Sequence, residues 1–322
     1  MINDSISKKI IVTGGAGFIG SNIVKKLNYL GIDNILIIDD VGQNKHKKSI
    51  VNNLNFDTMI SINDFIEDLD NFKNISCVFH QGACSDTMNH DKTYMLSNNS
   101  DYSLKILNHC LNQNADFIFA SSASVYGKGK KGFIEDKNNE MPLNIYAESK
   151  LLVDNEINNV LEQNLSSQVL SLRYFNVYGF PEFHKGRMAS VPFHFFNQIK
   201  SNNTIKLFEG SDNYYRDFIF IDDIINIISH LTKSKISGIY NAGTGFERSF
   251  QEMADITKEL YPKINIETIP FPENLKNYYQ KKTKADTSKL YQSGYNSPAT
   301  SLEKGLAKYY LYLENSKRNE PN

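Results

Sequence analysis

Long apolar runs and patterned cysteines are scarce in this chain of 322 residues. No apolar stretch approaches the ~18 residues of a membrane-spanning helix, and the N-terminal segment has no apolar core with a cleavage-like site. Three cysteines occur, Cys77, Cys84 and Cys110, and none has the spacing of a C-x-x-C pair. A sparse, odd set of thiols fits a reducing compartment, so we expect a cytoplasmic protein.

Charge of one sign is not in excess either. The 35 basic and 36 acidic residues leave a formal net charge of -1, which gives no electrostatic argument for nucleic acid or a membrane surface as a partner. The seven histidines and three cysteines show no metal-ligand spacing, so no metal is expected. The chain is longer than one hydrophobic core usually serves, which predicts a large α/β unit with an appended lobe, or two domains.

The first half of the chain alternates short, continuous apolar runs with longer amphipathic stretches. Continuous runs are typical of buried parallel strands, and the repeated order of strand, helix and strand predicts an α/β fold with a doubly wound parallel (Rossmann) sheet. Strands are predicted at 8–14, 34–39, 76–82, 116–122 and 167–174, with helices at 17–30, 91–113 and 145–163. In the more mixed second half, strands are predicted at 216–221 and 238–241, with helices at 189–201, 222–234, 249–261 and 300–314.

A glycine-rich loop, "TGGAGFIGSN", follows the first predicted strand and opens the first predicted helix. Gly14, Gly17 and Gly20 let the backbone turn tightly and approach a pyrophosphate at the helix N-terminus. The acidic pair Asp39-Asp40 ends the second strand about 20 residues later, as a dinucleotide site requires. A glycine turn with a purely structural role is the alternative. We predict a dinucleotide site.

The acidic pair bears on which dinucleotide binds. Asp39 is placed to accept hydrogen bonds from a ribose with free hydroxyls, which favours NAD. The following "NKHKK" contains Lys45, His46, Lys47 and Lys48, which could receive a 2′-phosphate if the loop folds back, or could be a solvated loop tip. These residues leave NAD and NADP both open.

A reaction centre is predicted beyond the fourth strand. That strand ends in "ASSASVYG", which places Ser122 near the ligand-binding edge of the sheet, and the next helix carries Tyr146 and Lys150. Residues four apart lie on one helix face, where an ammonium lowers the pKa of a phenol from its usual ~10. Such a pair also occurs in ordinary packing. Beside a nicotinamide, a serine would hold the substrate oxygen, a tyrosine would exchange its proton and a lysine would grip the ribose.

These motifs together resemble the extended short-chain dehydrogenase/reductase superfamily, which acts mostly on nucleotide sugars. The segments "RYFNVYG", "RDFIFIDD" and "NAGTG" are similar to its second half, and the resemblance runs from about residue 9 to residue 315. Three longer segments, "HQGACSDT", "FHKGRMASVPFH" and "LFEGSDNYYRDF", resemble the ADP-L-glycero-D-manno-heptose 6-epimerases, a family of lipopolysaccharide inner-core precursor synthesis.

The resemblance implies an activity and a domain plan. The activity is isomerisation at C6 of ADP-D-glycero-D-manno-heptose, through transient oxidation to a 6-keto intermediate and re-reduction by a tightly bound nicotinamide cofactor, NADP with NAD possible. A homo-oligomer, a pentamer in the family, is implied too. We expect a dinucleotide-binding domain over 9–176, to which 217–245 returns, and a smaller C-terminal α/β substrate lobe over 177–216 and 246–315.

The resemblance also implies roles for individual residues. It makes Tyr146 and Lys185 the two acid/base groups, with Ser122 and Lys150 assisting. The cofactor set is Gly14, Gly17, Phe18, Ile19, Gly20, Asp39, Asp40, Gln81, Gly82, Ala83, Cys84, Ser85, Asn98, Tyr146, Lys150, Val177 and Lys185. The substrate set is Asn176, Arg187, His194, Phe208, Glu209, Gly210, Ser211, Arg216 and Tyr279. The chain departs from the family at Gln81, where a glutamate is usual, at Arg187, where a serine is usual, and near Ile62, where a lysine binds the 2′-phosphate.

Two acid/base groups suit an inversion, because one base does not easily serve both faces of a carbonyl carbon. Each proposed group has a plainer alternative. Lys185 is also readable as a loop or phosphate-contacting lysine, His194 as a core histidine, and Arg216 as a partner of nearby aspartates.

Competing functions are another nucleotide-sugar epimerase, a dehydratase, or a non-catalytic dinucleotide-binding protein. A dehydratase needs an acidic pair where Ala123 and Ser124 stand. A binding protein would be free to lose Ser122, Tyr146 and Lys150, which this chain keeps.

Overall fold

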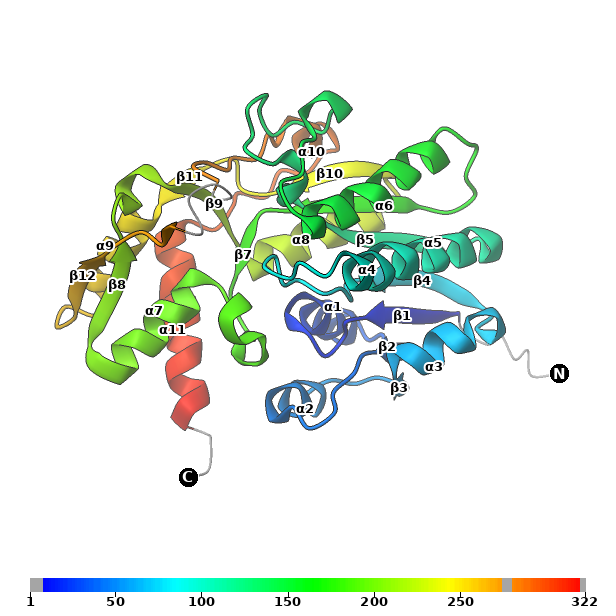
Figure 1. The fold of residues 1–322 in the computed structure, drawn as a ribbon. Coiled ribbons are helices and arrows are strands. Elements are labelled where there is room, and N and C mark those ends of the chain that lie inside the picture. Colours follow the sequence, from blue (N-terminus) through cyan, green and yellow to red (C-terminus); the bar gives the residue numbers. More distant parts are fainter. Residues whose placement is uncertain (1–7, 274–279, 319–322) are drawn as a thin grey trace. The chain divides into compact units, whose positions relative to one another are not determined.

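The computed structural model describes residues 8–273 and 280–318 (Figure 1). By its internal contacts the chain divides into two compact units. The first unit comprises the described chain up to Ser121, Ile145–Leu172 and Ser229–Tyr240. The second comprises Ser122–Asn144, Arg173–Ile228 and the described residues from Asn241 onward. Within these residues, no helix combines the length and apolar character needed to cross a membrane.

A seven-stranded sheet in the order β10-β6-β5-β4-β1-β2-β3 organises the first unit. Its strands are β1 (Lys9–Thr13), β2 (Ile35–Ile38), β3 (Thr58–Ile60), β4 (Ile75–His80), β5 (Asp116–Ser122), β6 (Val169–Tyr174) and β10 (Gly238–Ala242). Neighbours from β3 to β5 pair in parallel. The reversal of strand order beside β1 is the switch point of a doubly wound sheet, where the carboxyl ends of strands form a ligand site.

Helices connect the strands in the pattern expected for parallel crossovers. They are α1 (Phe18–Tyr29), α2 (Lys45–Val51), α3 (Ile62–Glu67), α4 (Lys92–Met95), α5 (Tyr102–Gln113) and α6 (Ile145–Leu161), and a π-helical stretch, Leu96–Asp101, joins α4 to α5. Asn44 caps α2 by accepting the backbone N–H groups of His46 and Lys47. Asn114 ends α5 in the left-handed conformation, which asparagine tolerates better than most residues.

The core of the first unit is made from the inward faces of these elements. It includes Ile11 and Leu36 of the sheet, Phe117 and Phe119 of β5, and Ile106 of α5, all almost fully buried. Burial on both faces explains why the strands read as continuous apolar runs.

The second unit contains two smaller sheets, β11-β9-β7 and β12-β8. Its strands are β7 (Asn176–Tyr178), β8 (Thr204–Phe208), β9 (Tyr215–Phe220), β11 (Glu247–Ser249) and β12 (Asn265–Ile269), and its helices include α7 (Val191–Asn202), α9 (Phe250–Leu260), α10 (Ser288–Gln292) and α11 (Leu302–Arg318). Helix α8 (Ile221–Lys233) begins in this unit. The partly buried rings of Phe180 and Tyr312 stack in this unit with their centroids 4.4 Å apart.

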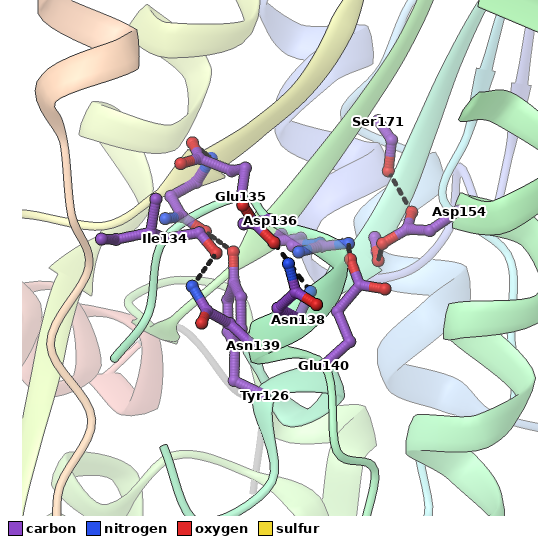
Figure 2. Close-up of polar contacts among 12 residues, drawn as sticks. Tyr126, Ile134, Glu135, Asp136, Asn138, Asn139, Glu140, Asp154 and Ser171 are labelled. Atoms are coloured by element: carbon purple, nitrogen blue, oxygen red, sulfur yellow. Dashed lines mark hydrogen bonds and ion pairs between the residues drawn. The ribbon is translucent and has the colours of Figure 1, made fainter. Parts of the chain in front are cut away.

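The segment between β5 and α6 also belongs to the second unit, and Figure 2 shows the contacts that hold it. The Tyr126 hydroxyl donates to Asn241 Oδ1 at 2.7 Å. Arg173, almost fully buried, is paired with Glu140 and lies with its guanidinium carbon 4.9 Å from the Tyr126 ring centroid. These contacts fix the chain directly after Ser122, a predicted site residue.

The predicted doubly wound sheet with additional smaller C-terminal sheets is confirmed. Each predicted strand and helix has a counterpart with ends that differ by a few residues, except that the helix predicted at 91–113 is divided into α4, the π-helical stretch and α5. The reading of Lys45 to Lys48 as a loop tip was wrong, because α2 begins there. The short strands β3, β7, β8, β11 and β12 were not predicted.

Candidate active site

The glycine loop between β1 and α1 is shaped so that no side chain intrudes on it. Gly14 has φ +66°, and a Cβ there would lie 2.8 Å from the backbone N of Gly82. A Cβ on Gly20 would lie 2.2 Å from the Gly14 carbonyl oxygen. Helix α1 has Gly17 as its N-cap, with no side-chain cap and no acidic residue in the first turn. The first turn of α1 itself therefore supplies no anion to the N-terminal dipole, which fits a pyrophosphate.

Asp39 follows β2 and is 6% exposed. Its Oδ2 accepts the Ala16 N–H at 2.9 Å, which ties it to the glycine loop. Its Oδ1 is ion-paired with Lys47 Nζ at 2.7 Å, and Lys47 also donates to the Asp40 carbonyl oxygen. Asp40 Oδ1 accepts the Ile62 N–H at 3.4 Å. One cation of the predicted basic stretch thus contacts the predicted ribose-binding carboxylate.

A hydrogen-bond chain supports the loop after β4, where Gln81 to Ser85 are predicted cofactor residues. The Gly82 N–H donates to Thr13 Oγ1, and the His80 ring lies between Thr13 and Ser103, with its nitrogens 2.7 and 2.8 Å from their hydroxyl oxygens. Because Ser103 donates to the Asn99 carbonyl, it accepts from His80 Nε2, and Nδ1 accepts from Thr13. Burial, and then the charge of Lys150, lower the pKa of His80 to about 3, so the ring is neutral.

Asn99, in the π-helical stretch, holds the same loop from the other side. Its Oδ1 accepts the Cys84 N–H at 2.8 Å, and its Nδ2 donates to the Cys84 carbonyl at 3.0 Å and to Ser149 Oγ at 3.2 Å. The predicted cofactor residue Asn98 donates to Asn99 Oδ1. A π-bulge is a frequent mark of a functional site.

Helix α6 presents Tyr146 and Lys150 one turn apart. Tyr146 is partly buried and Lys150 is 3% exposed. Lys150 Nζ donates to the Ala120 carbonyl at 2.8 Å and lies 4.8 Å from the Phe119 ring centroid. Burial lowers the pKa of Lys150 to about 8, against the opposing charge of Asp154. An amine so placed titrates near physiological pH, as functional groups often do.

Ser122 is the last residue of β5. Its Oγ accepts the Ser124 N–H at 3.2 Å. Since this bond uses a lone pair, the hydroxyl proton of Ser122 can be donated to another oxygen.

The second unit contains the other predicted acid/base group, Lys185, in the 3₁₀ segment Phe183–Met188. Its Nζ lies 2.9 Å from Glu182 Oε1. Glu182 is fully buried and also accepts the Ser190 N–H at 3.0 Å and the Tyr309 hydroxyl at 2.9 Å. Lys185 is therefore anchored by a carboxylate that itself has several donors.

The predicted substrate residues of this unit lie on several elements. His194 Nε2 is 3.3 Å from the Arg187 carbonyl oxygen, so the helix and the preceding loop meet here. Arg216 is 6% exposed, with its guanidinium carbon 5.4 Å from the Phe250 ring centroid. The remaining members are Asn176, at the start of β7, and the turn after β8, from Phe208 to Ser211 with Gly210 left-handed. Tyr279 lies outside the described residues.

Sequence reasoning missed the buried polar groups that support these residues. Asp154, Glu182 and Asp217 are fully buried carboxylates. The Asp217 oxygens accept four donors: Thr244 N–H, Thr244 hydroxyl, Gly245 N–H and Ala285 N–H. The sequence offered one signal for two of these carboxylates, because residues three or four apart can form ion pairs: Glu182 stands three residues before Lys185, and Asp154 four residues after Lys150.

A doubly wound sheet, a side-chain-free glycine loop and a Tyr-x-x-x-Lys helix define a dinucleotide-binding α/β protein. Residues 10–243 match the model of the NAD dependent epimerase/dehydratase family. The chain belongs to this family, and a nicotinamide dinucleotide fits the glycine loop and the acidic residue after β2.

Three relatives show how close the similarity is. The chain is 50% identical over 313 residues to an ADP-L-glycero-D-manno-heptose-6-epimerase of Brachyspira hyodysenteriae, covering 95% of this chain and 98% of that protein. The crystal structure of the Helicobacter pylori ADP-L-glycero-D-manno-heptose-6-epimerase is similar at a TM-score of 0.83 and 30% identity, covering 97% of this chain and 98% of that one. A UDP-N-acetylglucosamine 4-epimerase from Methanobrevibacter ruminantium has a TM-score of 0.83 and 26% identity, covering 96% and 99%.

Proposed function

We propose that this protein inverts C6 of ADP-D-glycero-D-manno-heptose to give ADP-L-glycero-D-manno-heptose, a step of lipopolysaccharide inner-core precursor synthesis. The observation that carries the proposal is the buried amine of Lys150 one turn from Tyr146. It occurs in a chain whose sequence is 50% identical to that of a protein called ADP-L-glycero-D-manno-heptose-6-epimerase. The nicotinamide ring, when bound, supplies reversible hydride exchange with the substrate carbon.

The predicted cofactor residues and Ser122 have binding and proton-handling roles in this proposal. The glycine loop and the N-terminus of α1 bind the pyrophosphate, and Asp39 faces the adenosine ribose. Tyr146 exchanges the proton of the C6 hydroxyl in one substrate pose. The positive charge of Lys150 favours the phenolate, and the Ser122 hydroxyl donates to the same substrate oxygen.

Lys185 serves the other substrate pose. Its ammonium is held by Glu182, so the amine has a fixed position from which to exchange a proton with the C6 oxygen. With two groups, the same carbon can be oxidised from one face and reduced on the other, without net redox change. In this proposal the predicted substrate set surrounds the ADP-sugar, and Arg216 pairs with the diphosphate.

We propose NADP as the cofactor, with NAD as the alternative that the experiment distinguishes. A carboxylate after β2 opposes a 2′-phosphate, but Lys47 already neutralises Asp39 at 2.7 Å. Lys47 is 23% exposed along its side chain, so a phosphate bound beside Asp39 would have access to this cation. Mass spectrometry of the nucleotide released from denatured protein decides between the two.

The function is tested with purified protein and ADP-D-glycero-D-manno-heptose, followed by chromatographic separation of the two C6 epimers. Interconversion is expected, with at least a ~100-fold slower rate for Tyr146→Phe, whose fold is retained. Conversion of UDP-N-acetylglucosamine instead would support a 4-epimerase. Retained dinucleotide without any conversion would support a binding protein.

We also propose that the protein works in the cytoplasm as a homo-oligomer. Its three thiols, Cys77, Cys84 and Cys110, are free, which fits a reducing compartment. Multi-angle light scattering gives the number of subunits, and a pentamer is expected.

A further inference from the structure

Helix α6 carries two buried ions of opposite sign one turn apart. Lys150 and Asp154 are 3% and 0% exposed, and their spacing of four places them on one helix face. Both contact β5: Lys150 Nζ donates to the Ala120 carbonyl at 2.8 Å, and Asp154 Oδ2 accepts the Ser121 hydroxyl at 2.9 Å. The opposite carboxylate oxygen accepts the hydroxyl of Ser171 on β6 at 2.6 Å, as Figure 2 shows.

Buried ions need compensation of charge as well as hydrogen bonds. The carbonyl of Ala120 and the hydroxyls of Ser121 and Ser171 fix the direction of the two side chains, but these groups are neutral. The opposite ion one turn away supplies the missing charge. Asp154 therefore compensates the charge of Lys150 in addition to connecting α6 to the sheet through hydrogen bonds.

We propose that Asp154 is a positioning residue for the reaction: its buried carboxylate keeps Lys150 in the charged form, while the Ala120 carbonyl holds the ammonium on β5. This inference rests on the proposed function, in which Lys150 acts on Tyr146. Asp154 itself is not assigned any contact with substrate or cofactor.

The charge of Asp154 raises the pKa of Lys150, as the proposal requires. Burial lowers the pKa of Lys150 to about 8, and the charge of Asp154 is the largest influence that opposes this shift. Without that charge, the pKa of Lys150 falls further. The titratable groups that act on Lys150 are Asp154 one turn along α6, Cys84 from the loop after β4, and neutral His80 from β4. Tyr146 lies one turn before Lys150 on α6, and the neutral hydroxyls of Ser121 and Ser171 contact Asp154.

Activity that needs the Lys150 cation is present below its pKa and falls as pH rises through about 8. In Asp154→Asn this basic limb should move to lower pH by about one unit. The asparagine keeps the size and most of the hydrogen bonding of the aspartate but removes its charge. The matched control, Ser171→Ala, removes one hydrogen bond and keeps the charge, so its limb should stay in place.

The first test is the pH profile of kcat for epimerisation in the wild-type protein, Asp154→Asn, Asp154→Glu and Ser171→Ala. A shift confined to Asp154→Asn, with the wild-type limb restored in Asp154→Glu, is expected. Equal shifts in Asp154→Asn and Ser171→Ala, or none in either, would overturn the inference. If the asparagine variant does not fold, Asp154→Ser, which also lacks the charge, takes its place with the same expected shift.

A second test does not depend on the substrate. The chain has 18 tyrosines and no tryptophan, so tyrosinate absorbance can be followed cleanly. Subtracting the titration of Tyr146→Phe isolates Tyr146, and the same subtraction is made in the Asp154→Asn background. The isolated step should move to higher pH without the Asp154 charge. If the Tyr146 titration shifts but the wild-type protein has no epimerase activity, the proposed function is wrong and this inference stands. If the protein is an active epimerase but the Tyr146 titration does not shift, this inference is wrong and the proposed function stands.

Discussion

Replacing Lys185 by methionine should separate a chemical role of this lysine from a structural one. The substitution removes the ammonium 2.9 Å from Glu182 Oε1 and keeps an unbranched side chain of similar length. Glu182 is fully buried in the wild-type protein, and its oxygens keep the neutral donors Ser190 N–H, Ser190 hydroxyl and Tyr309 hydroxyl.

The cost follows from the loss of the charged partner. A hydrogen bond to a charged group contributes about 1.5–3 kcal/mol, and a buried carboxylate without its cation is penalised further. Because Lys185 is 21% exposed, the lower half of that range applies, so the free energy of unfolding should fall by about 1.5–2 kcal/mol. Epimerisation should slow by at least ~100-fold if the amine handles a proton.

The double variant Glu182→Gln with Lys185→Met supplies the decisive comparison. A neutral amide can accept the Ser190 N–H and donate to the Tyr309 hydroxyl, so the urea midpoint should return most of the way to the wild-type value. The rate should stay low. If kcat recovers together with the midpoint, or if Lys185→Met turns over at the wild-type rate, the assignment of Lys185 as the second acid/base group is wrong.

Three further outcomes are expected. Gly20→Ala, whose Cβ would lie 2.2 Å from the Gly14 carbonyl oxygen, should lose copurified dinucleotide and about 1–3 kcal/mol of stability, and unchanged nucleotide absorbance would contradict this. Lys47→Gln should weaken NADP binding about tenfold by calorimetry, with a smaller effect on NAD; equal effects would remove Lys47 from phosphate recognition. Asp217→Asn should turn an amide toward backbone N–H donors and lower the unfolding free energy by about 2–3 kcal/mol in urea, whereas a neutral result would show that this strand-to-loop contact is dispensable.

The fold of the first unit was predictable because its strands are buried on both faces. Runs such as Ile35–Ile38 contain only large apolar residues and are bounded by polar ones. Most strands of the second unit are short and partly exposed, and β12, Asn265–Ile269, has no fully buried residue, so its apolar pattern is weak. Strand β9, Tyr215–Phe220, is almost wholly buried and was predicted. Helix α2 was missed because its amphipathic signal is short and its start depends on the Asn44 cap.

The residues of the candidate site were predictable from the sequence only where they form a motif of fixed local spacing. The glycines and the Tyr-x-x-x-Lys spacing are local patterns, so their placement followed from the chain alone. Asn99 and Glu182 are ordinary polar residues until the fold buries them, and their partners Cys84 and Tyr309 are 15 and 127 residues away. Sequence spacing does not report such distant pairings.

The Tyr309 hydroxyl connects the C-terminal helix to the segment that carries Lys185. A truncation that removes α11 from Tyr309 onward would strip a proton donor from Glu182 and open a fully enclosed anion to water. The segment Phe183–Met188, which contains Lys185, would then be held less firmly by Glu182. The deleted stretch itself contains no residue assigned to substrate or cofactor. Engineering at this end of the protein, including fusions or shortened variants, should therefore leave the helix intact at least through Leu313, the last of its fully enclosed apolar residues.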